Sequence, residues 1–73
     1  MEDGMEKIKI HTEFIKLNQL LKLANAAESG GAANHMIREG RVKVNGETEV
    51  QKGKKIHPGD LVEVDAIGSF LIG

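Results

Sequence analysis

The sequence has no cysteine, tryptophan or tyrosine, and its 73 residues include one proline and two phenylalanines. Without cysteine, neither a disulfide nor a thiolate metal site can stabilise the fold. No apolar run reaches the roughly 20 residues of a membrane-spanning helix, and the N-terminus lacks a signal-peptide pattern. We therefore expect a small cytoplasmic protein without a membrane segment, whose thin core leaves no room for the deep pocket of an enzyme.

Patterns of catalytic and metal-binding residues are also missing. The three histidines, His11, His35 and His57, are scattered and form no pattern typical of metal ligands. The sequence contains no Walker loop, no dinucleotide fingerprint and no nucleophile elbow. It therefore predicts no catalytic activity, no metal and no cofactor.

Charge is segregated along the chain, although the net charge is only −1. Residues 37–57 carry six cations against three acids, whereas residues 58–73 carry three acids and no cation. The cations are Arg38, Arg41, Lys43, Lys52, Lys54 and Lys55. This distribution predicts one positive and one negative side, a field that can orient the protein on a polyanion.

Hydrophobic periodicity predicts the secondary structure. Alternation favours a strand over residues 7–11, with Ile8 and Ile10 inward, and 3.6-residue spacing favours a helix over 13–25 with Thr12 as its N-cap. The expected core of that helix is Phe14, Leu17, Leu20, Leu21 and Ala24. Later strands are expected over 48–51, 55–56, 61–65 and 69–72, the last at an edge of the sheet. Residues 1–5 are expected to form a disordered extension, and residues 6–73 a single domain.

The central stretch SGGAANHMIREGRVKVNG, residues 29–46, contains a helix start, a helix end, a strand and a turn. Ser29 is a favourable N-cap, and Gly40 stands where a helix commonly ends in a left-handed residue. The next four residues alternate between cations and valines, as in a half-buried strand. Asn45-Gly46 favours a type I′ hairpin turn.

Three cations of this stretch, Arg38, Arg41 and Lys43, are expected to share one outward surface suited to a phosphate backbone. The alternative is that they are ordinary solvated charges, and the basic turn 52–55 has the same two interpretations. Gly30-Gly31 in the first helical turn can admit a phosphate oxygen to bare amides, or can simply let the first helix approach closely. Phe14 is assigned to the core, so base stacking on an aromatic side chain is disfavoured.

Four segments in register resemble the S4 RNA-binding domain. That family typically shows R-L-D, then S-R-x-x-A, then L-I-x-x-G-x-V-x-V-N-G, and finally V-x-x-G-D-x-I/V-x-V. The corresponding segments here are KLN at 16–18, SGGAA at 29–33, MIREGRVKVNG at 36–46 and IHPGDLVEV at 56–64. The resemblance covers about two thirds of the chain without a gap, and it is closest to small stand-alone bacterial proteins of this kind.

The resemblance implies an α+β fold in which two helices pack on a small, mostly antiparallel sheet, the αL motif. It also implies a non-catalytic protein that binds structured RNA, either ribosomal RNA or ribosome-associated tRNA, with a ribosomal or other protein as a possible further partner. The RNA-binding residues carried over are Lys16, Asn18, Lys22, Ser29, Gly30, Asn34, Arg38, Arg41 and Lys43. Three of them depart from the family pattern, because Asn18 replaces an aspartate, Gly30 an arginine, and Asn34 a commonly basic residue. The loss of basic side chains at positions 30 and 34 predicts a weaker electrostatic hold on RNA.

Two other functions stay open. The segment GDLVEVDAIG at 59–68 resembles the approach to the tail of a β-grasp sulfur carrier, although that chemistry needs a terminal Gly-Gly and this chain ends Ile72-Gly73. Alternatively, the acidic C-terminal face could dock a protein partner. Docking of a protein on the acidic face is compatible with RNA binding on the opposite face.

Overall fold

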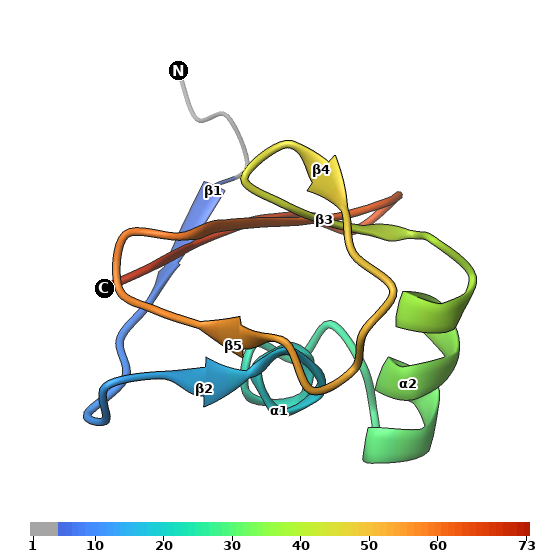
Figure 1. Cartoon of the computed structure of the whole chain (residues 1–73), viewed down its shortest axis with the longest axis horizontal. Helices are drawn as coiled ribbons and strands as arrows, with labels where there is room; N and C mark the ends of the chain where they lie inside the picture. The colour runs from blue at the N-terminus through green and yellow to red at the C-terminus, as the bar shows by residue number, and fades with distance from the viewer. Residues whose placement is uncertain (1–4) are drawn as a thin grey trace.

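The computed structural model describes residues 5–73, in which a five-stranded sheet covers two short helices (Figure 1). The elements in chain order are β1 (Met5–Ile8), β2 (Ile15–Lys16), α1 (Leu17–Leu23), α2 (Gly30–Arg38), β3 (Val42–Val44), β4 (Glu47–Thr48), β5 (Lys55–Ile56), β6 (Leu61–Val64) and β7 (Gly68–Ile72). The sheet has the order β1-β7-β6-β3-β4, antiparallel except for the β1–β7 pair. The predicted α+β class is thus confirmed.

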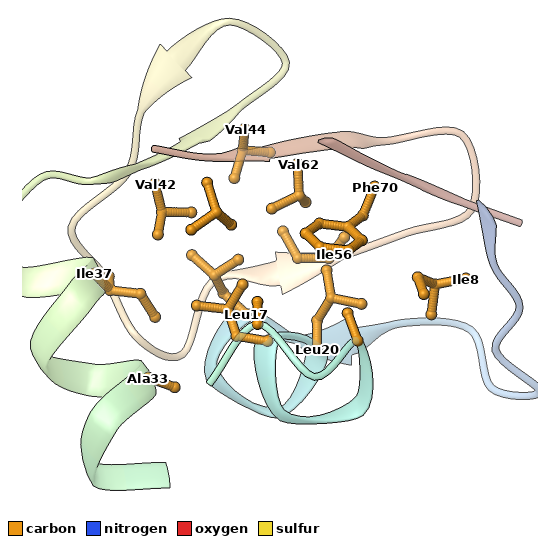
Figure 2. Close-up of a cluster of buried hydrophobic side chains, with 14 of the residues drawn as sticks. Ile8, Leu17, Leu20, Ala33, Ile37, Val42, Val44, Ile56, Val62 and Phe70 are labelled. Carbon is orange, nitrogen blue, oxygen red and sulfur yellow. The ribbon is translucent and has the colours of Figure 1, made fainter. Parts of the chain in front are cut away.

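The core lies between the sheet and the helices (Figure 2). Period-two alternation sends one set of side chains down from the sheet, and the helices contribute the facing set. The labelled members of this core are Ile8, Leu17, Leu20, Ala33, Ile37, Val42, Val44, Ile56, Val62 and Phe70. Ile56 comes from the separate β2–β5 ribbon, which therefore closes the core beside α1.

The first helix is shorter than its sequence pattern predicts, and the expected N-cap at Thr12 is wrong. Residues 15–16 form β2 and pair with β5, so α1 begins only at Leu17. Its first two amides are satisfied by the chain between β4 and β5: Leu17 N donates to Lys54 O at 2.9 Å, and Asn18 N to Lys52 O at 3.1 Å. This tertiary capping replaces a side-chain cap, because Lys16 in the N-cap position makes none.

The core position that helical spacing predicts for Phe14 is also wrong. In the extended chain leading into β2, successive side chains point to opposite faces. Ile15 therefore packs against the core, whereas Phe14 is only partly buried and is absent from the side chains that make up or adjoin the core cluster.

The second half of the predicted pattern is reproduced closely. The Ser29 hydroxyl accepts a hydrogen bond from Ala32 N at 3.2 Å as the N-cap of α2. Gly40 follows the helix with φ 79°, and Asn45 and Gly46 adopt φ 54° and 88°, as a type I′ turn requires. The pairing strand after that turn is Glu47–Thr48, shorter and earlier than the predicted 48–51.

The ends of the chain pair differently from the expectation. Residues 68–72 form β7 inside the sheet, between β6 and β1, and β1 takes the edge. β1 begins at Met5, within the expected extension, and ends at Ile8, while Ile10 lies half-buried against the core. Residues 1–4, which make up the rest of that extension, lie outside the described residues.

Asp60 joins the hairpin turn to the turn before β6. Its carboxylate accepts hydrogen bonds from the His57 amide at 2.8 Å and from Asn45 Nδ2 at 3.1 Å. Asn45 Oδ1 in turn accepts from Leu61 N at 2.9 Å. Burial acts to raise the pKa of Asp60, but these hydrogen bonds and the positive charges of His57 and Lys54 outweigh it and hold the pKa below 3.8.

This lowered pKa predicts acid sensitivity. As the pH falls, Asp60 of the unfolded chain is protonated near pH 3.8, before Asp60 of the folded protein. The contribution of ionised Asp60 to the free energy of unfolding is therefore complete above that pH. It is lost as the pH falls through the lower pKa of the folded state. The free energy of unfolding, measured by urea titration across an acidic pH series, is therefore expected to fall more steeply for the wild type than for Asp60→Asn. A difference between the two proteins that is independent of pH would contradict this assignment.

Candidate nucleic-acid interface

Three of the predicted site residues form a stripe along α2. Gly30, Asn34 and Arg38 are spaced by four residues and so lie on one flank of the helix. Asn34 Oδ1 accepts a hydrogen bond from Asn18 Nδ2 of α1 at 3.0 Å, which places this flank beside the start of α1. The Oδ1 atom of Asn18 is buried without a hydrogen-bond partner among residues 5–73, so Asn18 faces the helix junction and positions the two helices.

A basic loop lies next to that junction. The carbonyls of Lys52 and Lys54 accept the two hydrogen bonds from the first amides of α1, so the loop between β4 and β5 is fixed against the helix. In Figure 1 this yellow-to-orange segment descends from β4 to α1. Lys55 at its end pairs directly with Lys16 in the β2–β5 ribbon. Like charges in directly opposed positions of two strands destabilise the pair, so this placement of Lys16 and Lys55 lowers the stability of the ribbon.

The stripe and the loop together are called here the helix-side surface. Its residues are Lys16, Asn18, Gly30, Asn34, Arg38, Lys52, Lys54 and Lys55. Within the part of the chain that the structure describes, none of its cations comes within 4.0 Å of a carboxylate oxygen. Two of them, Lys54 and Lys55, also line a hollow with Glu47, Glu49 and Asp60. Cations that form no ion pair, beside small polar groups, form a surface to which the phosphates of a nucleic acid can bind.

Arg41 and Lys43 lie on the opposite side of the sheet. Val42 and Val44 are buried toward the helices, so the alternation of β3 turns its cations to the outer face. They line a hollow there that Glu39, Glu63 and Asp65 also line. Arg41 Nη1 lies 4.0 Å from Glu39 Oε1, and Lys43 is directly opposite Glu63.

The expected cationic surface is therefore divided. Arg38 belongs to the α2 stripe and does not line the outer hollow, whereas Arg41 and Lys43 share that hollow with acids. Lys22, in the last turn of α1, lines a separate shallow groove with Ile15 and Leu23. The assignment of Lys22, Arg41 and Lys43 to RNA contacts stays a prediction, made from sequence register alone.

Steric fit does not explain the glycine pair at the start of α2. A Cβ built on Gly30 would meet no atom within 4 Å, and one on Gly31 would meet only the Ser29 hydroxyl at 3.9 Å. The first helix is thus not close enough to require glycine at either position. The interpretation that remains from the sequence is close approach of a ligand to the backbone.

The site residues predicted from the sequence do not include Lys52, Lys54 and Lys55. The basic turn 52–55 was the only sequence signal for them, and a charged turn is usually a solvated one. Their place beside α1 follows from hydrogen bonds that join residues more than thirty positions apart.

Across residues 5–73 no histidine, cysteine or carboxylate cluster could hold a metal ion, and no helix there is long and apolar enough to cross a membrane.

The free space at the glycine pair yields a stability prediction. Gly30→Ala and Gly31→Ala should each raise the free energy of unfolding by about 0.5–1 kcal/mol, because alanine restricts the unfolded chain and fits the helix. Gly46→Ala is the matched control: its Cβ also meets no atom, but φ is 88°, so this variant should be less stable than the wild type. Chemical denaturation measures all three, and destabilisation by the helix variants would mean that the glycines are structurally required.

Comparison with known proteins identifies the family. The model of the S4 domain family matches residues 8–72. A Bacillus subtilis (strain 168) protein, named "Probable ribosome maturation protein RlbA", is 45% identical over 65 residues, which cover 89% of this chain and 92% of that protein. An Escherichia coli (strain K12) protein, named "Putative RNA-binding protein YbcJ", is 46% identical over 48 residues, 66% of this chain and 69% of its own length. The protein therefore belongs to the S4 domain family.

Proposed function

We propose that this protein binds structured RNA through the helix-side surface, without catalysing a reaction. The observation that carries the proposal is the set of cations around the start of α1 and along α2 that have no acidic partner within 4.0 Å in residues 5–73. Contacts from lysine and arginine to phosphates supply most of the affinity of such binding. These contacts recognise the shape of the RNA backbone and not the sequence of its bases.

The individual residues have different roles in this proposal. Lys16, Lys52 and Lys55 bind phosphates as mobile point charges, while Arg38 offers a planar donor group at the end of α2. The amides of the first turn of α2 are open to a phosphate oxygen because Gly30 and Gly31 add no side chain there, and Ser29 keeps the helix start ordered.

The names of the relatives suggest the kind of RNA. The Bacillus subtilis relative is named a ribosome maturation protein, and the Escherichia coli relative an RNA-binding protein. We infer that the RNA bound by this chain is ribosomal RNA or a ribosome-associated tRNA. Membership of the S4 domain family favours this function over that of a β-grasp sulfur carrier.

The outer hollow of the sheet supports a second candidate function, docking of a protein. Glu63 and Asp65 lie there, and Ile67 beside them is 48% exposed. A large apolar side chain among charges of both signs is more typical of a protein contact than of a phosphate site. The two functions use opposite sides of the sheet, so one protein could carry both.

The proposal predicts which charge reversals weaken RNA binding. The double variant Arg38→Glu with Lys52→Glu should bind a structured ribosomal RNA fragment at least about tenfold more weakly than the wild type, because two phosphate contacts become repulsive. The dependence of log affinity on log salt should also become shallower by about 0.9 for each lost contact. Fluorescence anisotropy across a potassium chloride series measures both quantities.

Arg41→Glu with Lys43→Glu is the matched control, since it changes the net charge by the same amount on the outer face. We expect it to weaken binding much less than the helix-side variant. If the outer-face variant loses more affinity, the RNA lies over β3. Binding that does not weaken with salt would contradict phosphate recognition altogether.

A further inference from the structure

The exposed face of the β2–β5 ribbon carries an unusual group of side chains. Ile15 pairs with Ile56 and Lys16 with Lys55, and the two isoleucines face the core. Continuing this antiparallel register by one residue places Phe14 opposite His57. The side chains on the exposed face are therefore Phe14, Lys16, Lys55 and His57.

The distances confirm that this group is compact. The rings of Phe14 and His57 lie 6.1 Å apart between centroids, with an angle of 53° between their planes. Lys55 Nζ lies 4.9 Å from the centre of the Phe14 ring. The backbone at Phe14 is held in place, because the Thr12 hydroxyl donates a hydrogen bond of 2.7 Å to its carbonyl.

Folding alone does not account for these residues. Phe14 is partly exposed and does not belong to the core, and the His57 side chain is 57% exposed. Lys16 and Lys55 are like charges in directly opposed positions, an arrangement that destabilises a ribbon. A partly exposed aromatic ring between two cations is instead a combination that can bind an unpaired nucleotide.

We propose that Phe14, with His57 beside it, stacks against one unpaired base of the bound RNA, while Lys16 and Lys55 bind the phosphates next to that base. The inference rests on the proposed function and adds to it a single-stranded nucleotide adjoining the structured RNA. Lys16 precedes α1 directly and Lys55 follows the basic loop, so the stacking site continues the helix-side surface without a break. On binding, the Lys55 ammonium exchanges the ring face for a phosphate.

Acidic groups near His57 limit where the phosphates can lie. Asp60 Oδ2 is 3.8 Å from His57 Nδ1, and Asp60, Glu47 and Glu49 line a hollow that His57, Lys54 and Lys55 also line. Lys16 does not line this hollow, so phosphates that its acids repel are directed toward Lys16. The nucleotide chain should therefore run from Phe14 toward the start of α1, where the lysine loop lies.

The test uses two labelled RNA hairpins of the same helical sequence. One ends in an unpaired 3′ nucleotide bearing 2-aminopurine, and the other ends in the same nucleotide without a base, so both carry the same phosphates. At low ionic strength the wild type should bind the base-bearing hairpin about tenfold more tightly, and the fluorescence of 2-aminopurine should be quenched by stacking.

The variants assign the preference to Phe14. Phe14→Leu keeps an apolar side chain and should bind both hairpins with the affinity of the wild type for the base-free one. Phe14→Tyr is the matched control and should retain the preference.

Each other outcome has a definite meaning. Equal, salt-dependent binding of both hairpins by the wild type, or a preference retained by Phe14→Leu, would overturn the stacking site and leave the proposed function intact. Absence of any binding would overturn the proposed function and this inference with it.

Discussion

Two backbone hydrogen bonds, from Leu17 N to Lys54 O and from Asn18 N to Lys52 O, determine how this small domain is assembled. They cap α1 with a loop in place of a side chain, and so attach the segment between β4 and β5 to the helix layer. The same bonds bring two lysines of that segment, Lys52 and Lys54, beside the start of α1. The bonds that cap the helix therefore also position the lysines of the loop. If the loop detached from α1, the first amides of that helix would lose their hydrogen-bond acceptors.

The sheet separates the charges of the chain into two environments. On the helix side the cations have no acidic partner within 4.0 Å in the described range 5–73, although Lys54 and Lys55 line a hollow with Glu47, Glu49 and Asp60. These cations lie around a helix start that its glycines leave open. On the outer side Arg41 and Lys43 share a hollow with Glu39, Glu63 and Asp65. The net charge of −1 is therefore the sum of unevenly distributed charges. As proposed above, the helix-side surface binds RNA and the outer hollow is a candidate contact for a protein. Contacts on the surface suit a chain of 73 residues, because its core is small.

Local sequence chemistry was sufficient for the segment from α2 to the hairpin turn. Ser29, Gly40 and Asn45-Gly46 each specify backbone geometry through their own side chain or the lack of one, so their roles could be read directly. The start of the first helix could not be predicted in this way. Residues 14–16 fit a helical pattern, and a strand partner about 40 residues away makes them a strand instead. The residues of the candidate site fall into the same two groups, those placed by local sequence and those placed by distant partners. The α2 stripe follows from helical spacing, whereas the lysine loop and the partly exposed position of Phe14 depend on long-range pairing.

The most direct test of this account is a map of the RNA-bound surface by NMR. Backbone amide shifts of the full chain would be followed while a structured ribosomal RNA fragment is added at low salt. The account predicts that the largest changes fall on Lys16, the first turn of α2 and residues 52–55, with small changes over β3, β6 and β7. Changes concentrated on Arg41, Lys43 and the strands facing the outer hollow would contradict it, because the RNA would then occupy the side of the sheet where cations and acids are mixed.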